Sequence, residues 1–264
     1  MAEGPSTGGA AGIALMRGVP PTLDRCELTF RGWEPFDLDR AIAQHASYAD
    51  LLRSLGLEVV ELPTDPAFPD CCFVEDVAVV LDEVALLGMP TPPSRRGEIA
   101  AVEEALARFR ALERTPLPAT LEGGDVLRVG RRVFAGLSAR SNPEGIEQLR
   151  VLLSPHGYTV EALPISGCLH LKSAVTQVGP ETVLLNPQWV DKGAFERYQL
   201  IEVDPAEPHA ANALLVGGGV IYPTAFPLTA ARLERAGVRL EPVNVSELTK
   251  AEGAVTCCSL ILEE

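Results

Sequence analysis

One short pattern recurs along this chain and limits the folds that it can adopt. In each copy, a stretch of helical periodicity ends near a glycine, and an apolar strand then runs into a proline or a turn. Clear copies span 55–63, 156–164 and 236–244, and weaker copies span 111–118 and 198–205. Glycine after the last helical turn favours a left-handed cap, and alternating Val and Leu residues are typical of a strand. The chain is therefore expected to consist of repeated units, each with a helix that leads into a strand.

Capping residues and periodicity locate the helices of these units. Ser94 can cap one helix, and Asn142 followed by Pro143 is a typical helix start. Asp191 can cap a further helix, and Pro227 precedes another. The predicted helices cover 38–55, where apolar side chains recur at helical spacing, 95–113, 143–153, a segment after Asp191, and 228–236.

Two short apolar strands around a turn recur as the other part of each unit. Such hairpin-length connections suit antiparallel pairing, so an ordinary doubly wound α/β fold fits less well. The sequence instead predicts one α/β domain over 1–264, in which five strand–strand–helix–strand (ββαβ) units lie radially around a central axis with the helices outside. The predicted strand pairs are 77–81 with 84–87, 126–129 with 132–135, 173–178 with 182–185, 213–216 with 219–222, and 254–262 closing near the N-terminus.

A polar loop precedes each hairpin at the same place in every unit. In a radial arrangement these loops all face the axis, so residues that are distant in sequence meet in one pocket. Together the loops hold cysteines, a histidine and several carboxylates. They are 73–76, 122–125, 170–173, Asn212 and 256–258.

A cysteine, a histidine and a carboxylate are a combination typical of nucleophilic catalysis. A thiol reacts as a thiolate, so it needs a nearby positive charge or a base. His170 can act as general acid and then as base, and Glu122 can orient its imidazole. Each residue also has a structural alternative, because a single cysteine is more often buried filler and the glycines of 122–125 suit a tight turn. Three complementary groups at matching positions favour catalysis. The other histidines, His45, His156 and His209, are predicted to be structural.

Charge and composition exclude several classes of function. A net charge of −14 and a pI near 4.8 disfavour nucleic acid or an anionic membrane as partner, whereas a small cationic substrate is compatible. No apolar run approaches the roughly 18 residues of a membrane span. Residues 1–12 are expected to be a flexible lead-in, because a signal peptide would begin with positive charge and carry a longer apolar stretch. We expect a cytoplasmic protein.

The six cysteines are expected to be reduced thiols. Cys71 with Cys72 and Cys257 with Cys258 are adjacent pairs, which make poor disulfides because neighbouring strand side chains point to opposite faces. The chain has no C-x-x-C and no paired His/Cys spacing typical of zinc. No organic cofactor and no catalytic metal are expected, although a thiol beside a histidine can bind zinc adventitiously and be inhibited.

Six motifs spread over the units together resemble the dimethylarginine dimethylaminohydrolase family. This family belongs to the guanidino-group-modifying superfamily, which has the five-bladed α/β propeller (pentein) fold. The resemblance runs in the same order from about Leu15 to the C-terminus. The motifs are PDCCFVEDVAVV at 69–80, PSRR at 93–96, LEGGDVL at 121–127, GLSARSN at 136–142, LHLKS at 169–173 and TCCS at 256–259.

The resemblance implies hydrolysis of Nω-methylated arginines to citrulline and methylamine or dimethylamine. Cys257 would attack the guanidinium carbon, and His170 would protonate the departing amine. Water would then resolve the covalent S-alkylthiouronium intermediate. Glu122 occupies the position of the family's acidic partner of the histidine. Cys258 is the less favoured nucleophile, because it follows Cys257 on a predicted strand and should face away; the family pattern, not the residues alone, selects Cys257.

The resemblance also implies a set of substrate-binding residues. A guanidinium needs a carboxylate in fork geometry, and the substrate's α-carboxylate needs cations. Taken singly, each residue has a structural alternative as a turn, helix-start or surface residue. Asp76 matches the guanidinium contact, Asp70 and Glu75 line or close the pocket, Arg95 and Arg140 match the two carboxylate-binding arginines, and Leu28 and Ala251 supply backbone or packing contacts.

Two other functions remain open, and a third is set aside. A related arginine deiminase or amidinotransferase would use the same cysteine, histidine and acid, although known deiminases carry an inserted helical segment that this chain lacks. A non-catalytic binding protein of the same fold would need no nucleophile. A papain-like protease would have its cysteine early and its histidine late, the reverse of the order here. The loop 24–36 is predicted to be a lid over the site, and the sequence does not predict the oligomeric state.

Overall fold

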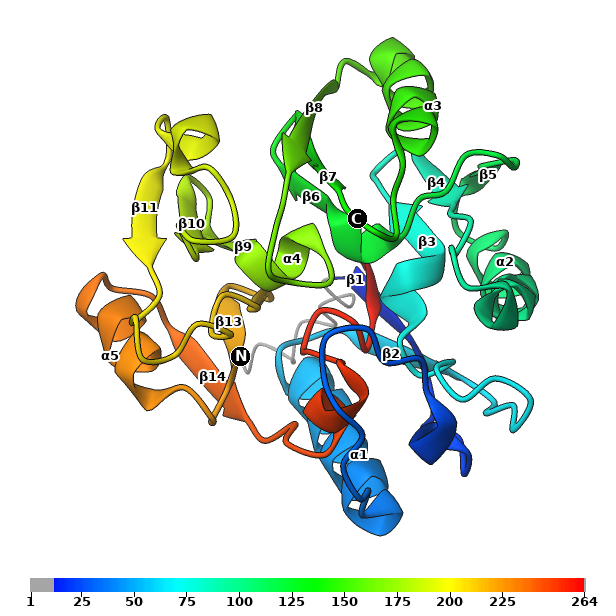
Figure 1. Cartoon of the computed structure of the whole chain (residues 1–264), viewed down its shortest axis with the longest axis horizontal. Helices are drawn as coiled ribbons and strands as arrows, with labels where there is room; N and C mark the ends of the chain where they lie inside the picture. The colour runs from blue at the N-terminus through cyan, green and yellow to red at the C-terminus, as the bar shows by residue number, and fades with distance from the viewer. Residues whose placement is uncertain (1–11, 264) are drawn as a thin grey trace, which may run out of the picture.

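The computed structural model describes residues 12–263 and places their strands in five three-stranded sheets around a central axis (Figure 1). The predicted five-bladed α/β propeller is therefore confirmed. Residues 1–11 of the predicted lead-in lie outside the described residues, whereas Gly12 begins the first strand. The sheets are β15–β1–β2 (Leu260–Glu263, Gly12–Arg17, Glu58–Leu62), β3–β4–β5 (Ala78–Val80, Val84–Leu87, Ala111–Arg114), β6–β7–β8 (Val126–Val129, Arg132–Leu137, Thr159–Pro164), β9–β10–β11 (Val175–Gly179, Thr182–Leu185, Gln199–Glu202) and β12–β13–β14 (Leu214–Val216, Gly219–Pro223, Leu240–Val243).

Strand pairing follows one rule in every blade. The first two strands of each sheet pair antiparallel, and the middle strand pairs parallel with the third. A tight turn can join an antiparallel pair, whereas the parallel pair needs a crossover. An outer helix lies in this crossover in four blades, and between β10 and β11 the crossover holds only the 3-10 turn Lys192–Phe195. The first and last strands of the described residues close the ring, because β15 pairs with β1 and places Leu260 opposite Leu15.

Helices cover the outside of the ring (Figure 1). The predicted helix after Asn142 is confirmed with its cap: the Asn142 side chain accepts a hydrogen bond from the N–H of Gly145, and Pro143 is the first helical residue. The outer helices are α1 (Leu38–Ser54), α2 (Ile99–Leu106), α3 (Pro143–Leu153) and α5 (Pro227–Arg235), and the short α4 (Leu171–Ala174) lies near the axis.

Two predicted helices are wrong in extent. The expected helix over 95–113 is a 3-10 segment (Pro93–Glu98) followed by α2, and β5 already begins at Ala111. Its start differs because Arg95 and Glu98 turn into the core and pair with each other there. Ser94 does not cap it, and its hydroxyl donates to Glu27 instead. After Asp191 the chain forms only a 3-10 turn, Lys192–Phe195, which the Asp191 side chain caps.

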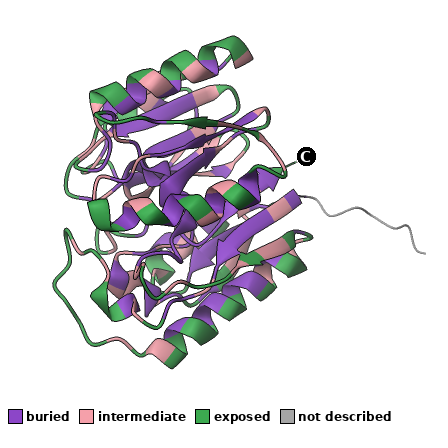
Figure 2. Cartoon of the chain, turned by 90° about the vertical axis from the view of Figure 1, so that its right-hand side faces the viewer, coloured by how far each residue is buried: buried purple, intermediate pink, exposed green. Residues whose placement is uncertain are grey.

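The core lies between the sheets and the helices that cover them. Figure 2 shows the strands buried and the helices exposed on their outer sides. On α3, for example, Ile146, Leu149 and Leu153 are buried against the sheet, whereas Val151 faces solvent. Burying each such aliphatic side chain contributes roughly 1.5–3 kcal/mol. This ring of packed blades holds the axis-facing loops in place.

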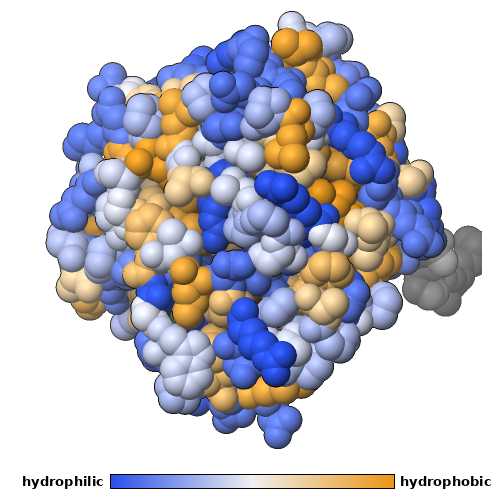
Figure 3. Space-filling model, turned by 45° about the vertical axis from the view of Figure 1, so that its right-hand side comes forward, coloured by the Kyte–Doolittle hydropathy of each residue, from blue (hydrophilic) through white to orange (hydrophobic). Residues whose placement is uncertain are grey.

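The surface mixes hydrophilic side chains with small apolar areas on the face shown in Figure 3. Among residues 12–263, no helix combines the length and the apolar character needed to cross a membrane. All six cysteines lie in this part of the chain and are free thiols, as predicted.

Candidate active site

Hydrogen bonds join the predicted axis-facing loops to one another. Lys172 Nζ donates to Glu75 Oε1 at 2.6 Å, and Thr256 Oγ1 donates to Glu75 Oε2 at 2.7 Å. The Asn212 side chain donates to Thr256 Oγ1 and to the carbonyl of Lys172. The loop 122–125 approaches the loop 73–76 by its backbone, because a Cβ added at Gly123 would lie 2.0 Å from the carbonyl oxygen of Glu75. The radial arrangement thus brings the five loops together.

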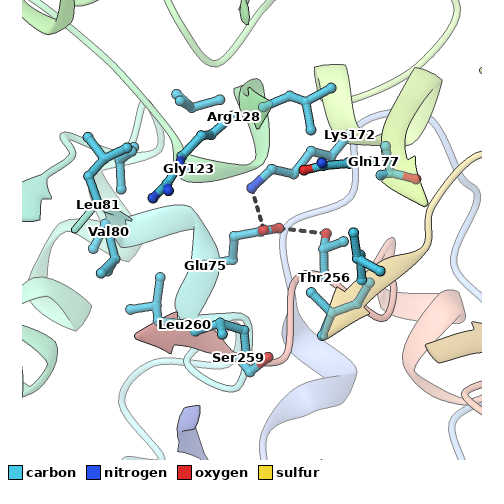
Figure 4. Close-up of a pocket in the computed structure, with 18 of the residues that line it drawn as sticks. Glu75, Val80, Leu81, Gly123, Arg128, Lys172, Gln177, Thr256, Ser259 and Leu260 are labelled. Carbon is cyan, nitrogen blue, oxygen red and sulfur yellow. Dashed lines mark hydrogen bonds and ion pairs between the residues drawn. The ribbon is translucent and has the colours of Figure 1, made fainter. Parts of the chain in front are cut away.

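A cavity of about 190 Å³ lies at this junction (Figure 4). Its lining includes Glu75, Lys172 and Thr256, and the dashed lines of Figure 4 mark the contacts that Glu75 makes with the other two. Apolar residues of the strands β3, β6, β12 and β15 supply much of its wall. Glu75 therefore connects the loops at the axis, whereas Cys257, His170 and Glu122 do not line this cavity.

Glu122 and His170 form a buried pair. The Nε2 atom of His170 lies 2.8 Å from Oε2 of Glu122, and both side chains are buried. Glu122 precedes the 3-10 turn Gly123–Asp125, and His170 immediately precedes α4. A Cβ added at Gly124 would lie 2.6 Å from Nδ1 of His170, so glycine is required for this close approach. With Nε2 bound to Glu122, Nδ1 is the ring atom left for proton transfer.

Three carboxylates act on the pKa of His170. Burial by itself lowers this pKa, but the negative charges of Asp76, Asp125 and Glu122 outweigh burial and raise it to about 9. His170 is therefore protonated at neutral pH in this state. A protonated imidazole beside a carboxylate is suited to donate a proton to a leaving group.

Cys257 lies in a turn and not on the predicted strand. The structure forms β15 only from Leu260, and 255–258 form a turn in front of it. Cys258 therefore does not follow Cys257 on a strand, and the predicted strand is wrong at this position. Cys258 is fully buried, and its Sγ donates to the carbonyl of Ala254. The N–H of Glu75 donates to the carbonyl of Cys257, which ties the cysteine turn to the 73–76 loop.

The thiol of Cys257 is protonated in this state. Burial raises its pKa well above the ordinary value, and the negative charges of Asp76 and Glu75 raise it further. Cys257 is therefore not an active thiolate by itself. It needs an added positive charge to ionise.

Asp76 has one engaged oxygen and one free oxygen. Arg95 Nη1 donates to Oδ2 at 2.7 Å, whereas Oδ1 has no hydrogen-bond partner among the described residues and lies 3.8 Å from His170 Nδ1. Burial acts to raise the pKa of Asp76, but His170 and Arg95 outweigh it, so the pKa is lowered. An ionised, buried oxygen without a donor is an acceptor site for a ligand N–H.

The two predicted carboxylate-binding arginines both lie buried in this cluster. Arg95 donates from Nε and Nη2 to both oxygens of Glu98, in addition to its bond to Asp76. Arg140 Nη1 lies 3.3 Å from Glu122 Oε2, and its Nη2 donates to Thr29 Oγ1 at 3.1 Å. The structural alternatives, a surface arginine at the start of a helix and a surface ion pair, are therefore wrong.

The remaining predicted residues lie around this centre. Asp70 is buried and accepts from the N–H of Glu27; burial, opposed by Arg95, raises its pKa to about 6. Leu28 follows Glu27 in the loop and is half-buried. Ala251 ends the 3-10 turn Leu248–Ala251 and packs in the core cluster that contains Cys257.

A carboxylate that the sequence did not single out holds the loop 24–36. Glu252 accepts hydrogen bonds from three consecutive N–H groups, those of Thr29, Phe30 and Arg31. Glu252 itself has a φ of +58°, which a residue other than glycine rarely adopts. In the sequence, Gly253 directly after Glu252 is a local signal for a turn, but it does not indicate a contact with the loop 24–36. Beside this loop lies a cavity of about 440 Å³, lined by residues such as Phe30, Trp189, His209 and Glu252.

Asp76, Glu122 and His170 together offer the ligand types of a metal site. Ligand atoms of Asp76, Glu122 and His170 all lie within 4.8 Å of one another. However, the guanidinium groups of Arg95 and Arg140 pair with the two carboxylates. Positive charges in direct contact with both carboxylates disfavour a divalent cation, so we interpret the cluster as an acid–base centre.

Comparison with known proteins identifies the family. The model for "N,N dimethylarginine dimethylhydrolase, eukaryotic" matches residues 34–203. The N(G),N(G)-dimethylarginine dimethylaminohydrolase of Streptomyces coelicolor is 38% identical, with 95% of this chain and 97% of that protein covered. The protein of the same name from Pseudomonas aeruginosa is 35% identical, with 85% and 89% covered.

Solved structures agree with this assignment. A mutant of the Pseudomonas aeruginosa enzyme complexed with citrulline has a TM-score of 0.91 and 32% identity, with 96% of this chain and all of that chain covered (100%). The N-terminal domain of the cyanobacterial arginine dihydrolase ArgZ has a TM-score of 0.87 at 21% identity over 96% and 98% of the two chains, and shows a shared fold. This chain belongs to the dimethylarginine dimethylaminohydrolase family.

Proposed function

We propose that this protein hydrolyses Nω-methylated arginines, asymmetric dimethylarginine and monomethylarginine, to citrulline and dimethylamine or methylamine. One observation carries the proposal: the free Oδ1 of Asp76 is buried, ionised and 3.8 Å from Nδ1 of the His170–Glu122 pair. An acceptor for a guanidinium thus lies next to a proton donor. The names of the relatives supply the substrate class.

Asp76 is proposed to bind the guanidinium, and the arginines to bind the α-carboxylate of the substrate. Arg140 is more available than Arg95 to bind the carboxylate, because its Nη2 donates only to Thr29 Oγ1 in the loop 24–36. Arg95 uses all its nitrogens on Glu98, Asp76 and backbone carbonyls, so it must exchange one bond for the substrate. Glu75, Asp70, Leu28 and Ala251 are proposed to line the pocket.

The substrate cation supplies the charge that Cys257 lacks. When the guanidinium binds Asp76, it offsets the negative charges that raise the pKa of the thiol. Cys257 then releases its proton to solvent, since His170 already carries its own proton, and the thiolate forms a bond to the guanidinium carbon. This step gives a neutral tetrahedral adduct in place of a buried cation.

His170 handles the protons in both halves of the reaction. Its Nδ1 protonates the departing amine as the carbon–nitrogen bond breaks, which leaves an S-alkylthiouronium on Cys257. The now neutral imidazole takes a proton from water, whose oxygen attacks the same carbon. Citrulline forms as the carbon–sulfur bond breaks and the thiol is restored. Glu122 keeps Nε2 bound, so that Nδ1 faces the reacting atoms.

The test compares three substrates under one condition. Citrulline is measured after incubation with asymmetric dimethylarginine, monomethylarginine and arginine. The proposal predicts turnover of the methylated forms in preference to arginine, with a covalent adduct on Cys257 visible by mass spectrometry and lost in Cys257→Ser. Turnover of arginine alone would instead favour a deiminase.

We also propose that the enzyme works in the cytoplasm, because a nucleophilic thiol needs a reducing compartment.

A further inference from the structure

Asp125 is a buried carboxylate close to the catalytic residues, and the mechanism above gives it no step. It ends the 3-10 turn Gly123–Asp125 and is fully buried. Its Oδ1 accepts from the N–H of Leu171 at 2.9 Å, and its Oδ2 accepts from the hydroxyls of Ser138 (2.6 Å) and Ser141 (2.7 Å). Because all three partners donate, the hydrogen-bond pattern suits the ionised carboxylate.

Two of these bonds lead directly to the catalytic pair. Leu171 follows His170, so its N–H fixes the backbone from which the imidazole extends. The Ser141 hydroxyl, while donating to Asp125, accepts from the N–H of Glu122 at 3.1 Å. The backbones of His170 and Glu122 are therefore both tied to one carboxylate.

The third bond leads to Arg140. The Ser138 hydroxyl donates to Asp125 and accepts from the N–H groups of Arg140 (2.9 Å) and Ser141 (3.1 Å). This arrangement requires glycine at position 136, because a Cβ added there would lie 2.7 Å from Asp125 Oδ1. Asp125 thus anchors three site residues from separate places in the sequence.

We propose that Asp125 is a positioning residue that sets the mutual geometry of His170, Glu122 and Arg140. It acts on the catalytic pair through Leu171 and Ser141, and on the carboxylate-binding arginine through Ser138. The inference rests on the proposed function for the roles of these residues. Its geometry, however, can be tested without a substrate.

The charge of Asp125 acts in the same direction as its hydrogen bonds. His170 faces Glu122 at Nε2 and Asp76 at Nδ1, and Arg140 Nη1 lies 3.3 Å from the same Oε2 of Glu122. The negative charge of Asp125 adds to those of Asp76 and Glu122 in raising the pKa of His170. Removal of this charge therefore gives a signal at the imidazole itself, which a loss of stability elsewhere in the fold would not give.

The first test separates charge from shape. Asp125→Asn keeps the size of the side chain and removes its charge, so the pKa of His170, followed by NMR of its ring protons, should fall by about 1 unit. The resonance is assigned by its loss in His170→Asn. With asymmetric dimethylarginine, kcat should fall at least about 100-fold, as for loss of general acid catalysis.

The second test separates the two serine branches. Ser141→Ala cuts the link to Glu122 and should lower kcat about tenfold with KM nearly unchanged. Ser138→Ala removes the acceptor of the Arg140 and Ser141 N–H groups, while the Ser141 hydroxyl still joins Glu122 to Asp125, so KM should rise about tenfold with a smaller fall in kcat. Opposite effects on the two parameters are not expected from a general loss of stability.

A matched control lies far along the chain. Thr229 is also fully buried, and its hydroxyl accepts from the N–H of Asp204 at 3.0 Å. Thr229→Val should lower stability and leave the pKa of His170 unchanged.

If Asp125→Asn leaves the pKa of His170 unchanged, or if both serine variants alter kcat and KM alike, Asp125 is structural and the inference is overturned. Absence of methylarginine turnover in the wild type rejects the proposed function instead, and the NMR titration still decides the role of Asp125.

Discussion

The Nζ atom of Lys172 lies 2.6 Å from Oε1 of Glu75, and this ion pair joins two of the axis-facing loops (Figure 4). Both side chains are largely buried, and the other oxygen of Glu75 accepts from Thr256. A buried carboxylate of this kind is stable only while its partner remains.

Removal of Lys172 should therefore destabilise the protein strongly. Lys172→Met leaves Glu75 buried without its counter-charge, which should lower the free energy of unfolding by about 3–5 kcal/mol in urea titrations. The double variant Lys172→Met/Glu75→Gln should recover much of this loss. As a control, Arg53→Gln breaks an exposed pair with Asp50 and should cost less than about 1 kcal/mol. Equal costs for the two single variants would contradict the buried role of the pair.

Glycine at position 124 is required by the histidine. A Cβ there would lie 2.6 Å from Nδ1 and 2.8 Å from Cγ of His170, so Gly124→Ala must displace the ring from Glu122. We expect kcat to fall at least about 100-fold, the usual contribution of a general acid. Gly32→Ala is the control, because a Cβ there has no atom within 4 Å. Full activity of Gly124→Ala would show that the ring position is not critical.

Glu252 should act as a latch for the loop 24–36. Glu252→Ala removes the acceptor of the three N–H groups at Thr29, Phe30 and Arg31, so hydrogen exchange at these amides should become at least about tenfold faster. Glu252→Gly also removes the acceptor but relieves the positive φ. Both variants should loosen the loop, and only Glu252→Gly should retain the overall stability. An unchanged exchange pattern would mean that other contacts hold the loop.

Alkylation of Cys257 should show its raised pKa. Without substrate, the rate of labelling by iodoacetamide should rise with each pH unit from 7 to 9 and reach no plateau, because the protonated thiol is unreactive. Asp76→Asn removes a negative charge beside the thiol and lowers its pKa. This variant should therefore be labelled faster than the wild type at pH 8 while it loses turnover. Slower labelling would contradict the assigned charge effect. Cys257→Ser identifies the labelled residue.

His45 should make the protein less stable in acid. Burial in α1 lowers its pKa from 6.5 to about 4, and its Nε2 has no partner among the described residues. In the unfolded chain His45 is protonated below about pH 6.5, whereas in the folded protein it is protonated only below about pH 4. The free energy of unfolding therefore falls as the pH drops from 6.5 to 4.

Replacement of His45 by Leu should remove this penalty. Urea unfolding at pH 8 and pH 4.5 should show a loss for the wild type that exceeds the loss for His45→Leu by about 2–3 kcal/mol, at ~1.36 kcal/mol per pKa unit over the two pH units below 6.5. A wild-type loss no larger than that of the variant would show that His45 is protonated in the folded state.

Local patterns were sufficient to predict the elements with strong signals. Asn142 with Pro143 marked the start of α3, and paired apolar runs such as 126–129 with 132–135 marked the hairpins. The helix predicted over 95–113 failed because Arg95 and Glu98 pair inside the core, a tertiary contact that periodicity does not show. The strand predicted over 254–262 failed because its first half turns at the axis to join Glu75.

The sequence by itself determined the five-unit order and brought Cys257, His170 and Glu122 to matching loops, because the periods of helices and strands are local properties. Only the tertiary structure decided how these groups are charged and held. Burial and neighbouring charges set the pKa values of Cys257 and His170, and these depend on the packing of all the blades. The Glu252 latch and the Asp125 anchor likewise join residues that no local pattern relates.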